Sequence, residues 1–461
     1  MRRLILFLAA AMASAYAQPA TPRTLRLDYV HTGTAKEEQF ALDGLALEGD
    51  WPGPLDRWID ETNLGPYRFQ VLDPATRHVI YSRGFASLFG EWQEISEAKQ
   101  LRRAFHESIR FPAPASPVEV VIQGRAPDNE FRDLWSMTVD PSDASIDRSA
   151  PPKLKVWSVV RNGTPRDKVD LLLLGDGYTT AEMDKWHRDA RRTTEQLFAV
   201  SPFKEHKQDF NVWAIDTPAE ESGVSRPSDG IYRHSPVGAS YDAFGSERYV
   251  LTFENKRLRQ IAAAAPYEFI EIVVNGRKYG GGGIFNLYAT VSSDNAFTPY
   301  VFVHEFGHHF AGLADEYYTS DVAYASDAKR PEPWAPNATA DSHAAKWVEL
   351  LTPGIELPTP WPKQEFEEME QAIQKRRRHI RAEHRPEEEM EKLFAEERSR
   401  DTKLLASGPN AGKVGAFEGA LYEARGYYRP QQDCIMFTRD EVGFCAVCRH
   451  AIERIIKLYA R

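Results

Sequence analysis

Two histidines and a glutamate stand in the order His-Glu-x-x-His, as His304, Glu305 and His308. Residues four apart lie on one face of a helix, so both imidazoles can bind the same metal ion. This spacing is typical of a catalytic zinc site. Glu305 follows His304 directly, where it can act as general base and take a proton from a zinc-activated water. We therefore expect one catalytic Zn2+ ion at His304 and His308.

The residues around the motif predict a helix with a defined start and end. Thr298 can cap its start, and Pro299 suits the first helical position. Gly312 can end it, because glycine adopts the left-handed conformation without steric cost. The apolar run 301–303 favours a buried helix over a chance match on a solvated one, and buried His and Glu side chains need partners.

A third ligand is expected after the glycine that ends this helix. Asp315 is the nearest carboxylate that can turn back toward the metal. Zinc accepts a carboxylate oxygen as readily as a third imidazole, and a catalytic site leaves its fourth position to water. The predicted metal ligands are thus His304, His308 and Asp315.

The chain begins like a secreted protein. Met1-Arg2-Arg3 is followed by an apolar run from Leu4 to Met12 and by Ala15-Tyr16-Ala17, the order of charged, apolar and small residues in a signal peptide. We expect cleavage of this leader near Ala17 and an extracellular or periplasmic location. The apolar run is too short to span a bilayer, and no other stretch is predicted to be a transmembrane segment.

Length and charge narrow the class of protein. The 461 residues suggest two or three domains, and a hydrophobic content of 42% is ordinary for a globular protein. The formal net charge of −10 becomes −12 once Arg2 and Arg3 leave with the leader. Because an acidic chain is a poor nucleic-acid binder, we expect no nucleic acid among its partners.

Residues 18–150 are predicted to form an N-terminal β-rich accessory domain like a sandwich. Short stretches alternate between apolar and polar residues, as antiparallel strands do. The clearest are 25–30, 67–72 and 118–122. The stretch 94–109 suits either a helix or a long loop. Residues 141–152 are polar and contain prolines, which suits a linker.

Residues 151–461 are predicted to form a second domain around a mixed, mostly parallel sheet. The apolar run 169–174 suits a strand buried on both faces, and two further strands are expected at 210–215 and 269–274. Thr179 and Glu182 predict a capping box for a helix that runs to about residue 200, and another helix is expected at about 246–264. Strands that alternate with helices imply parallel pairing.

A run of glycines ends at Gly283, and a strand is expected directly after it. Phosphate binding would require a helix at this point, so we exclude it. Glycines beside an edge strand permit close approach of another backbone. We expect Gly282, Gly283 and Ile284 to bind an extended peptide by strand addition.

Residues 363–402 are dominated by charge and carry only sparse apolar stripes. A break at Arg385-Pro386 divides them. This pattern predicts an exposed helical hairpin inserted in the second domain.

Three cysteines, Cys434, Cys445 and Cys448, lie near the C-terminus. In an oxidising compartment two of them are expected to form a disulfide and one to stay free. The alternative is a second metal site, for which the sequence shows no clear fourth ligand. Met436 suits either a loop under the metal or a filler of a gap in the core. Residues 445–460 predict an amphipathic C-terminal helix.

Taken together, these stretches resemble the IgA-peptidase (M64) family of zinc metallopeptidases, whose catalytic domains are metzincin-like. The resemblance covers nearly the whole mature chain and rests chiefly on the extended zinc motif, residues 304–317. The weaker markers are residues 87–92, 175–178, 279–284, 434–436 and 444–448. The resemblance implies an α+β multidomain endopeptidase with zinc on His304 and His308, Glu305 as general base, and Met436 in a turn under the metal.

The chain departs from the metzincin pattern at the glycine of the zinc motif. Gly312 comes one residue later than in that pattern, while the spacing from the glycine to Asp315 is kept. We favour Asp315 over Glu316 as the third ligand on the geometry of a metal site.

A second departure concerns the tyrosine that follows the methionine in metzincins. Thr438 stands two places after Met436. A tyrosine beside the metal must therefore come from elsewhere, and Tyr422 and Tyr428 are the candidates.

These observations predict a secreted zinc-dependent endopeptidase that hydrolyses a protein or peptide substrate. One alternative is a zinc amidase that acts on cell-wall or modified peptides and shares the metal chemistry. Another is a secreted binding protein with a structural zinc. A structural site is closed by four protein ligands and has no use for Glu305, so the sequence favours an enzyme.

Overall fold

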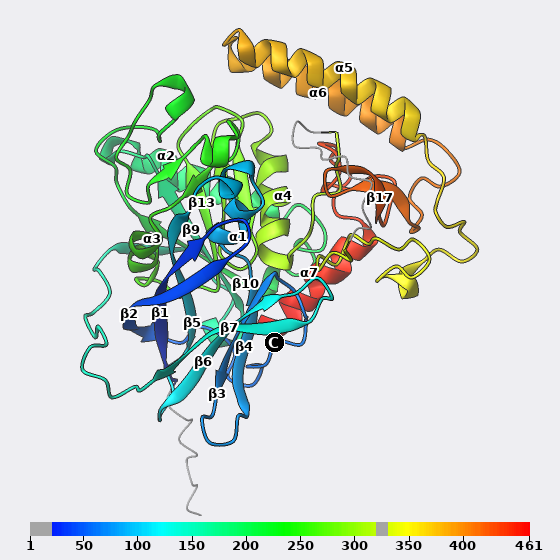
Figure 1. Ribbon diagram of the computed structural model, residues 1–461. Coiled ribbons are helices and arrows are strands. Elements are labelled where there is room, and N and C mark those ends of the chain that lie inside the picture. Colours follow the sequence, from blue (N-terminus) through cyan, green and yellow to red (C-terminus); the bar gives the residue numbers. More distant parts are fainter. Residues whose placement is uncertain (1–20, 320–330) are drawn as a thin grey trace, which may run out of the picture.

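The computed structural model describes residues 21–319 and 331–461 (Figure 1). The predicted leader, residues 1–17, lies outside the described residues. Antiparallel strands from the first third of the chain pack beside a mixed sheet with helices, so the fold is α+β as predicted. In the described ranges, no helix is both long and apolar enough to cross a membrane.

Two antiparallel sheets form the N-terminal part. The first has the strand order β2-β1-β5 and the second the order β4-β3-β6-β7. Their bounds are β1 Arg23–Gly33, β2 Glu38–Asp50, β3 Tyr67–Leu72, β4 Val79–Phe85, β5 Arg103–Pro112, β6 Val118–Arg125 and β7 Phe131–Val139. Aromatic rings from the two sheets meet between them. The ring centres of Tyr29 and Trp135 lie 6.3 Å apart, and those of Phe69 and Phe111 lie 6.4 Å apart. The inner faces thus bury one apolar core, as in a sandwich.

The stretch 94–109 is neither a helix nor a long loop throughout. A short helix, α1 Leu88–Gln93, comes before it, a single 3₁₀ turn covers Ser96–Lys99, and β5 begins at Arg103. The side chain of Ser87 caps α1 by accepting a hydrogen bond from the Gly90 amide. Strand β5 was hard to predict because its buried face includes Glu107, which breaks the apolar alternation.

A six-stranded mixed sheet lies at the centre of the second part. Its strand order is β14-β15-β13-β9-β10-β8. The bounds are β8 Lys155–Val160, β9 Val169–Asp176, β10 Phe210–Asp216, β13 Phe269–Val274, β14 Gly281–Ile284 and β15 Tyr288–Ser292. The four inner strands pair in parallel, whereas β8 and β14 run antiparallel at the two edges. All residues of β9 are buried, as its apolar run predicts.

Helices cover this sheet, and one of them differs from the prediction. Helix α2 Met183–Leu197 follows the predicted capping box of Thr179 and Glu182. The helix expected at 246–264 is only α3 Asn255–Ala262. The residues before it are not helical because β12 Leu251–Thr252 pairs with β11 Ala239–Ser240. Helix α4 Thr298–Ala311, which carries the His-Glu-x-x-His motif, also packs on this sheet.

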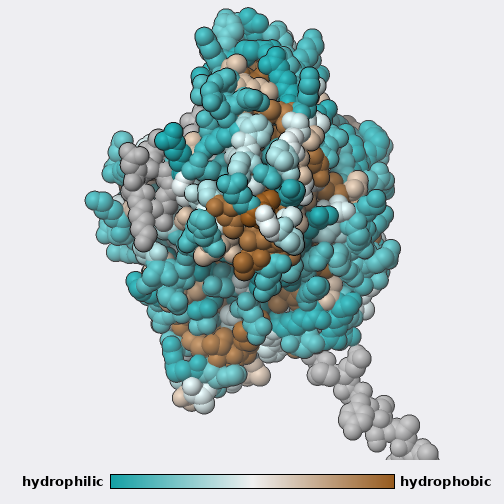
Figure 2. Space-filling model, turned by 90° about the vertical axis from the view of Figure 1, so that its right-hand side faces the viewer, coloured by the Kyte–Doolittle hydropathy of each residue, from teal (hydrophilic) through white to brown (hydrophobic). Residues whose placement is uncertain are grey.

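Residues 363–402 lie in two helices, α5 Lys363–Ala382 and α6 Glu387–Leu405, that pack against each other at the top of Figure 1. Their apolar stripes face inward, with Phe366, Ile373 and Leu393 buried. Figure 2 shows the outer surface of this end as mostly hydrophilic. The chain ends with the hairpin β16 Phe417–Ala420 and β17 Glu423–Arg429, and then α7 Ala446–Tyr459.

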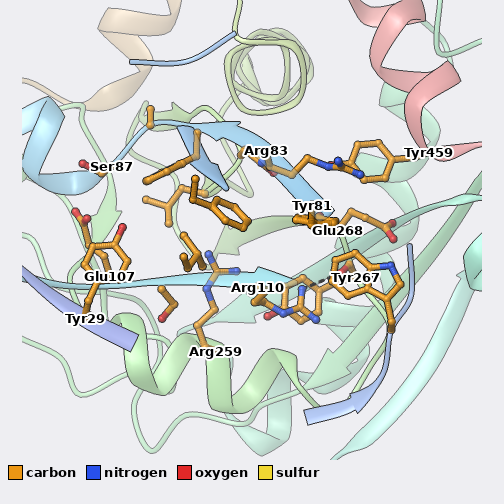
Figure 3. A pocket seen from close by; sticks show the side chains of 18 residues that line it. Tyr29, Tyr81, Arg83, Ser87, Glu107, Arg110, Arg259, Tyr267, Glu268 and Tyr459 are labelled. Atoms are coloured by element: carbon orange, nitrogen blue, oxygen red, sulfur yellow. Dashed lines mark hydrogen bonds between the residues drawn. The ribbon is translucent and has the colours of Figure 1, made fainter. Parts of the chain in front are cut away.

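Polar and aromatic side chains join the N-terminal sandwich to the second part around a cavity (Figure 3). The guanidinium of Arg110 lies 3.6 Å from the centre of the Tyr267 ring and donates to the Tyr267 carbonyl at 3.0 Å. Arg83 donates to the Tyr459 hydroxyl of α7 at 3.3 Å. The backbone of Ala86, just before α1, donates to the Phe285 carbonyl after β14 at 2.9 Å. These contacts place α1 beside the edge of the mixed sheet that carries β14.

Candidate active site

Helix α4 positions the motif and differs slightly at its start from the prediction. Phe297 is the capping residue, and Thr298 is already inside the helix. Instead of capping, the Thr298 hydroxyl donates to the Ser292 carbonyl at 2.7 Å, which ties the helix to the end of β15. At the other end, Gly312 has φ of +60°, so the predicted glycine stop is confirmed.

The three predicted ligands come together at one point, with His304 and His308 on α4 and Asp315 in the loop after it. The Nε2 atoms of His304 and His308 lie 3.1 Å apart, and each lies 3.1 Å from Oδ1 of Asp315. Two ligand atoms about 2.0 Å from one zinc ion, at a tetrahedral angle, lie about 3.3 Å from each other. The spacing of the donor atoms therefore fits a single metal ion.

Backbone carbonyls fix which imidazole nitrogens face the centre. Nδ1 of His304 lies 2.9 Å from the Ile435 carbonyl, and Nδ1 of His308 lies 2.5 Å from the Leu313 carbonyl. A carbonyl can only accept, so each Nδ1 carries the proton and each Nε2 of a neutral ring presents a lone pair. Two such lone pairs and a carboxylate oxygen converge on one point, which is favourable when a proton or a metal ion lies between them.

The electrostatics of the site also favour a positive charge. Burial would lower the pKa of His308, but the charge of Asp315 and its hydrogen bond raise that pKa to about 9. Burial would raise the pKa of Asp315, but the two histidines hold it well below its usual range. The carboxylate is thus ionised and available as a ligand.

Glu305 lies beside the two ligand histidines. A carboxylate oxygen of Glu305 and nitrogens of His304 and His308 all lie within 4.8 Å of one another. The side chain is only partly buried, unlike His304. Desolvation raises the pKa of Glu305, and the charges of the two histidines oppose that rise. A carboxylate in this position can exchange protons with a molecule bound at the centre.

Glu316 points away from this centre, although it follows Asp315 directly. Its Oε1 accepts a hydrogen bond from Asn337 Nδ2 at 2.9 Å and lies 3.3 Å from the sulfur of Cys448. The geometry therefore favours Asp315 over Glu316 at the histidine centre. Asn337 is fully buried and also donates to the Ala314 carbonyl, so it anchors the ligand loop.

Tyr422 supplies the tyrosine beside the ligands, whereas Tyr428 lies on β17 with its backbone paired to Thr339. The Tyr422 hydroxyl donates to Oδ2 of Asp315. Leu421 and Tyr422 have φ of +53° and +63°, a conformation that costs non-glycine residues about 1–3 kcal/mol each. Their amides donate to carbonyls of the ligand loop, those of Asp315 and Tyr317, at 3.0 Å, which holds this strained turn in place.

Met436 lies under α4, in the turn whose Ile435 carbonyl accepts a hydrogen bond from His304. Its sulfur would be 3.2 Å from a Cβ atom at Gly307, between the two ligand histidines of the helix. The backbone amide of Glu316 donates to the Met436 carbonyl at 2.8 Å. Met436 is fully buried, so it both fills the core and supports the ligand loop.

His309, the next residue after a predicted ligand, has a different role. Its Nδ1 lies 3.0 Å from the Ile284 carbonyl, and the Ile270 amide donates to its Nε2 at 3.2 Å. Desolvation lowers the pKa of His309 to about 3. The ring is therefore neutral and joins α4 to strands β13 and β14.

The predicted peptide-binding glycines lie on β14, the edge strand. A Cβ atom at Gly283 would lie 2.2 Å from the Glu305 carbonyl, and one at Gly282 would lie 2.5 Å from the Tyr249 ring. The glycines thus let α4 and Tyr249 approach the strand closely. Along the outer edge, the Val250 amide donates to the Gly281 carbonyl at 3.1 Å. The start of β14 is therefore covered, and the Ile284 carbonyl at its other end already accepts hydrogen bonds from His309 and from the Leu287 amide.

Sequence reasoning missed two polar groups near the centre because they come from distant segments. Glu91 of α1 accepts a hydrogen bond from the Tyr249 hydroxyl at 3.3 Å, and burial raises its pKa to about 7. Arg248 donates to the Tyr317 hydroxyl at 3.1 Å, and that hydroxyl lies 3.5 Å from the Tyr422 hydroxyl. The motif at residues 87–92 was the available signal for the first group.

An α+β fold with two histidines and a carboxylate on and after one buried helix defines a class of metal-binding hydrolase site. The family model described as IgA Peptidase M64 matches residues 158–456, and the model for the Peptidase M64 N-terminus matches residues 15–136. The chain therefore belongs to the IgA peptidase M64 family and is a peptidase. No curated protein matches the chain.

Proposed function

We propose that this protein is a secreted, zinc-dependent endopeptidase that hydrolyses peptide bonds. His304, His308 and Asp315 would hold the zinc ion, and Glu305 would act as general base. The observation that carries the proposal is the convergence of two Nε2 atoms and a carboxylate oxygen at 3.1 Å, with Glu305 beside them. The leader-like order of residues 1–17 supports secretion.

The residues of the site divide the reaction between them. When bound, zinc supplies a Lewis acid that polarises the scissile carbonyl and acidifies a water molecule. Glu305 accepts the proton of the attacking water and transfers it to the leaving amine. The hydrogen bonds from His304 and His308 to backbone carbonyls hold both rings in the ligand orientation throughout.

Tyr422 has two possible contributions that follow from its position. Its hydrogen bond orients the Asp315 carboxylate. When it turns away from Asp315, the same hydroxyl can donate its single proton to an oxygen that gains negative charge beside the centre, as an oxyanion donor does. Arg248 reaches this hydroxyl through Tyr317 and keeps positive charge nearby.

The substrate would lie between β14 and α1. Gly282, Gly283 and Ile284 lie on the edge strand of the sheet, next to α4, and the backbone of Gly283 would pair with the substrate. Glu91 and Tyr249 form the neighbouring wall, so the N-terminal sandwich would contribute to substrate binding. Replacing Gly282 with valine is a poor test, because the new side chain would first displace the Tyr249 ring.

The two alternatives differ in what they need from the site. A zinc amidase would use the same residues and differ only in its substrate. A binding protein with a structural zinc would have four protein ligands and no use for Glu305. Three ligands beside a partly exposed carboxylate support an enzyme.

The test is cleavage of a mixed peptide library by the zinc-loaded protein and by Glu305→Gln. We expect the variant to keep its zinc and lose turnover by roughly 100- to 10,000-fold. Glu349→Gln makes the same chemical change at an exposed position and should cut like the wild type. Cleavage confined to cell-wall peptides would favour the amidase, and full turnover by Glu305→Gln would reject Glu305 as the base.

A further inference from the structure

A second group of ligand-type side chains lies behind the histidine centre. The sulfurs of Cys434, Cys445 and Cys448 and a carboxylate oxygen of Glu316 all lie within 4.8 Å of one another. All four residues are buried, with exposed fractions of at most 4%. The cysteines come from the last 30 residues or so, whereas Glu316 comes from the ligand loop after α4. The sequence hid this group because its fourth member is more than 100 residues away.

The distances do not fit the disulfide expected from the sequence. All three cysteines are free, and the sulfurs of Cys434 and Cys448 lie 3.9 Å apart. Bonded sulfurs lie about 2.0 Å apart. Two thiolates at about 2.3 Å from one zinc ion, at a tetrahedral angle, lie about 3.8 Å apart. The sulfur of Cys448 and Oε1 of Glu316 are 3.3 Å apart, and that of Cys445 and the same oxygen are 4.0 Å apart.

Backbone amides point at two of the three sulfurs. The amides of Met436 and Cys445 donate to the Cys434 sulfur at 3.5 and 3.3 Å. The Cys448 amide donates to the Cys445 sulfur at 3.4 Å, which makes Cys445 the cap of α7. Both the N–H groups and the positive end of the helix dipole favour negative charge at this point.

Once deprotonated, this many buried groups need a cation beside them. Within the described residues, Oε2 of Glu316 has no hydrogen-bond partner, although it is buried. The buried Arg429 interacts electrostatically with Glu316 and Cys434 but donates its hydrogen bonds to backbone carbonyls. An unpaired buried carboxylate is costly, and a bound metal ion would remove that cost.

We infer that Cys434, Cys445, Cys448 and Glu316 bind a second divalent metal ion, zinc by ligand type, in a closed structural site. Three soft thiolates and one carboxylate select zinc over magnesium or calcium. Four protein donors leave no position for substrate or water. The inference goes beyond the proposed peptidase reaction and does not depend on it.

This second site would act as a clamp on the first. Glu316 is adjacent to Asp315, and its amide donates to Met436, two residues after Cys434. One metal ion would thus join three segments: the ligand loop, the turn under α4 and the start of α7. It would also protect the thiols from oxidation in an oxidising compartment.

The experiment counts metal per chain in protein purified under reducing conditions. We expect two zinc ions in the wild type, one in His304→Ala/His308→Ala and one in Cys445→Ser/Cys448→Ser. Asp401→Asn is the matched control, because Asp401 lies in another buried cluster with Glu370 and Glu397 that has no thiol. It should keep both ions.

Cobalt spectroscopy keeps the test decisive if the cysteine variant does not fold. Cobalt-loaded His304→Ala/His308→Ala should show the intense near-ultraviolet absorption of thiolate-to-cobalt charge transfer. Three results would overturn the inference. They are the absence of this absorption, a double histidine variant without metal, and a disulfide between any two of the cysteines in freshly isolated protein. Because this variant lacks the first centre, the result is independent of whether the protein cleaves peptides.

Discussion

The two clusters of ligand-type residues differ in how they meet the surface. His308 and Glu305 are only partly buried, and the histidine centre has three ligands from one helix and its loop. The cysteine cluster is fully buried and has four donors from two distant parts of the chain. An open coordination position permits chemistry, and a closed one permits only stabilisation. The contrast supports the proposed division, with catalysis at the first cluster and structural support at the second.

The boundary between the clusters runs between two adjacent residues. Asp315 turns toward His304 and His308, while Glu316 turns toward the thiols. Their shared backbone couples the two positions, so a disturbance of the buried cluster should shift Asp315 slightly within a histidine centre that still holds its ion. The predictions below test this division of roles in order of expected effect.

Chelation should separate the two centres most strongly. A zinc chelator in solution can reach the partly exposed histidine centre, whereas the buried one opens only with local unfolding. We expect peptidase activity to fall at least about 100-fold while about half of the bound zinc stays. Metal analysis and activity measured together during dialysis provide the check. Parallel loss of both ions would remove the distinction between open and closed sites.

Tyr422→Phe should affect the first centre alone. The change removes the hydroxyl that donates to Asp315 and leaves the ring. Loss of such a partner typically costs 10- to 100-fold, so we expect kcat to fall by about that factor with zinc content unchanged. Tyr428→Phe is the control, because Tyr428 is not beside the ligands. Equal loss in both variants would reject the role of Tyr422.

Gly307→Ala should disturb the contact between the helix and the turn under it. The added Cβ would lie 3.0 Å from the Phe444 ring and 3.2 Å from the Met436 sulfur. Overpacking of this kind costs about 1–3 kcal/mol. Urea unfolding should show a loss of that size, with lower kcat because His304 and His308 flank the glycine. A variant as stable and active as the wild type would mean that this contact is loose.

A second histidine–carboxylate cluster, in the N-terminal sandwich, sharpens the comparison because it should bind no metal. Nδ1 of His31 lies 3.1 Å from Glu107, and its Nε2 lies 2.9 Å from Glu38. Because each ring nitrogen of His31 faces a carboxylate, the imidazole is most stable when both nitrogens carry a proton. Burial would lower the pKa of His31, but the charge of Glu107 and hydrogen bonds to both carboxylates raise it above its usual value.

This raised pKa predicts a pH dependence of stability. The stabilisation is complete below the pKa of the unfolded histidine, about 6.5, and is lost as pH rises through the higher folded value. His31→Gln should therefore lower the free energy of unfolding by about 1.5 kcal/mol at pH 6 and by less at pH 9. Urea titrations at both pH values measure this, and a difference that is the same at both would contradict a charged His31.

Sequence reasoning worked where a function depends on local spacing. The four-residue interval from His304 to His308, the stop at Gly312 and the carboxylate at Asp315 follow from helix geometry, and the structure brings them together. The central strands were predicted from apolar runs for the same reason. Local pattern reading failed at residues 246–254, which look helical but are held by pairing with β11.

Contacts across long sequence intervals could not be predicted. Cys445 and Glu316 are separated by 129 positions, so no spacing rule joins them. Glu91 reaches the centre only because the sandwich packs beside β14. Asn337 is another such residue, because its buried side chain anchors the ligand loop from 21 positions beyond Glu316.

Crystals grown with zinc would test the division of roles most directly, by anomalous scattering at the zinc edge. We predict two peaks per chain. One should lie between His304, His308 and Asp315 with a solvent oxygen completing it near Glu305, and the other between the three cysteine sulfurs and Glu316. A single peak, or a histidine centre closed by a fourth protein ligand, would contradict the assignment of one open catalytic site and one closed structural site.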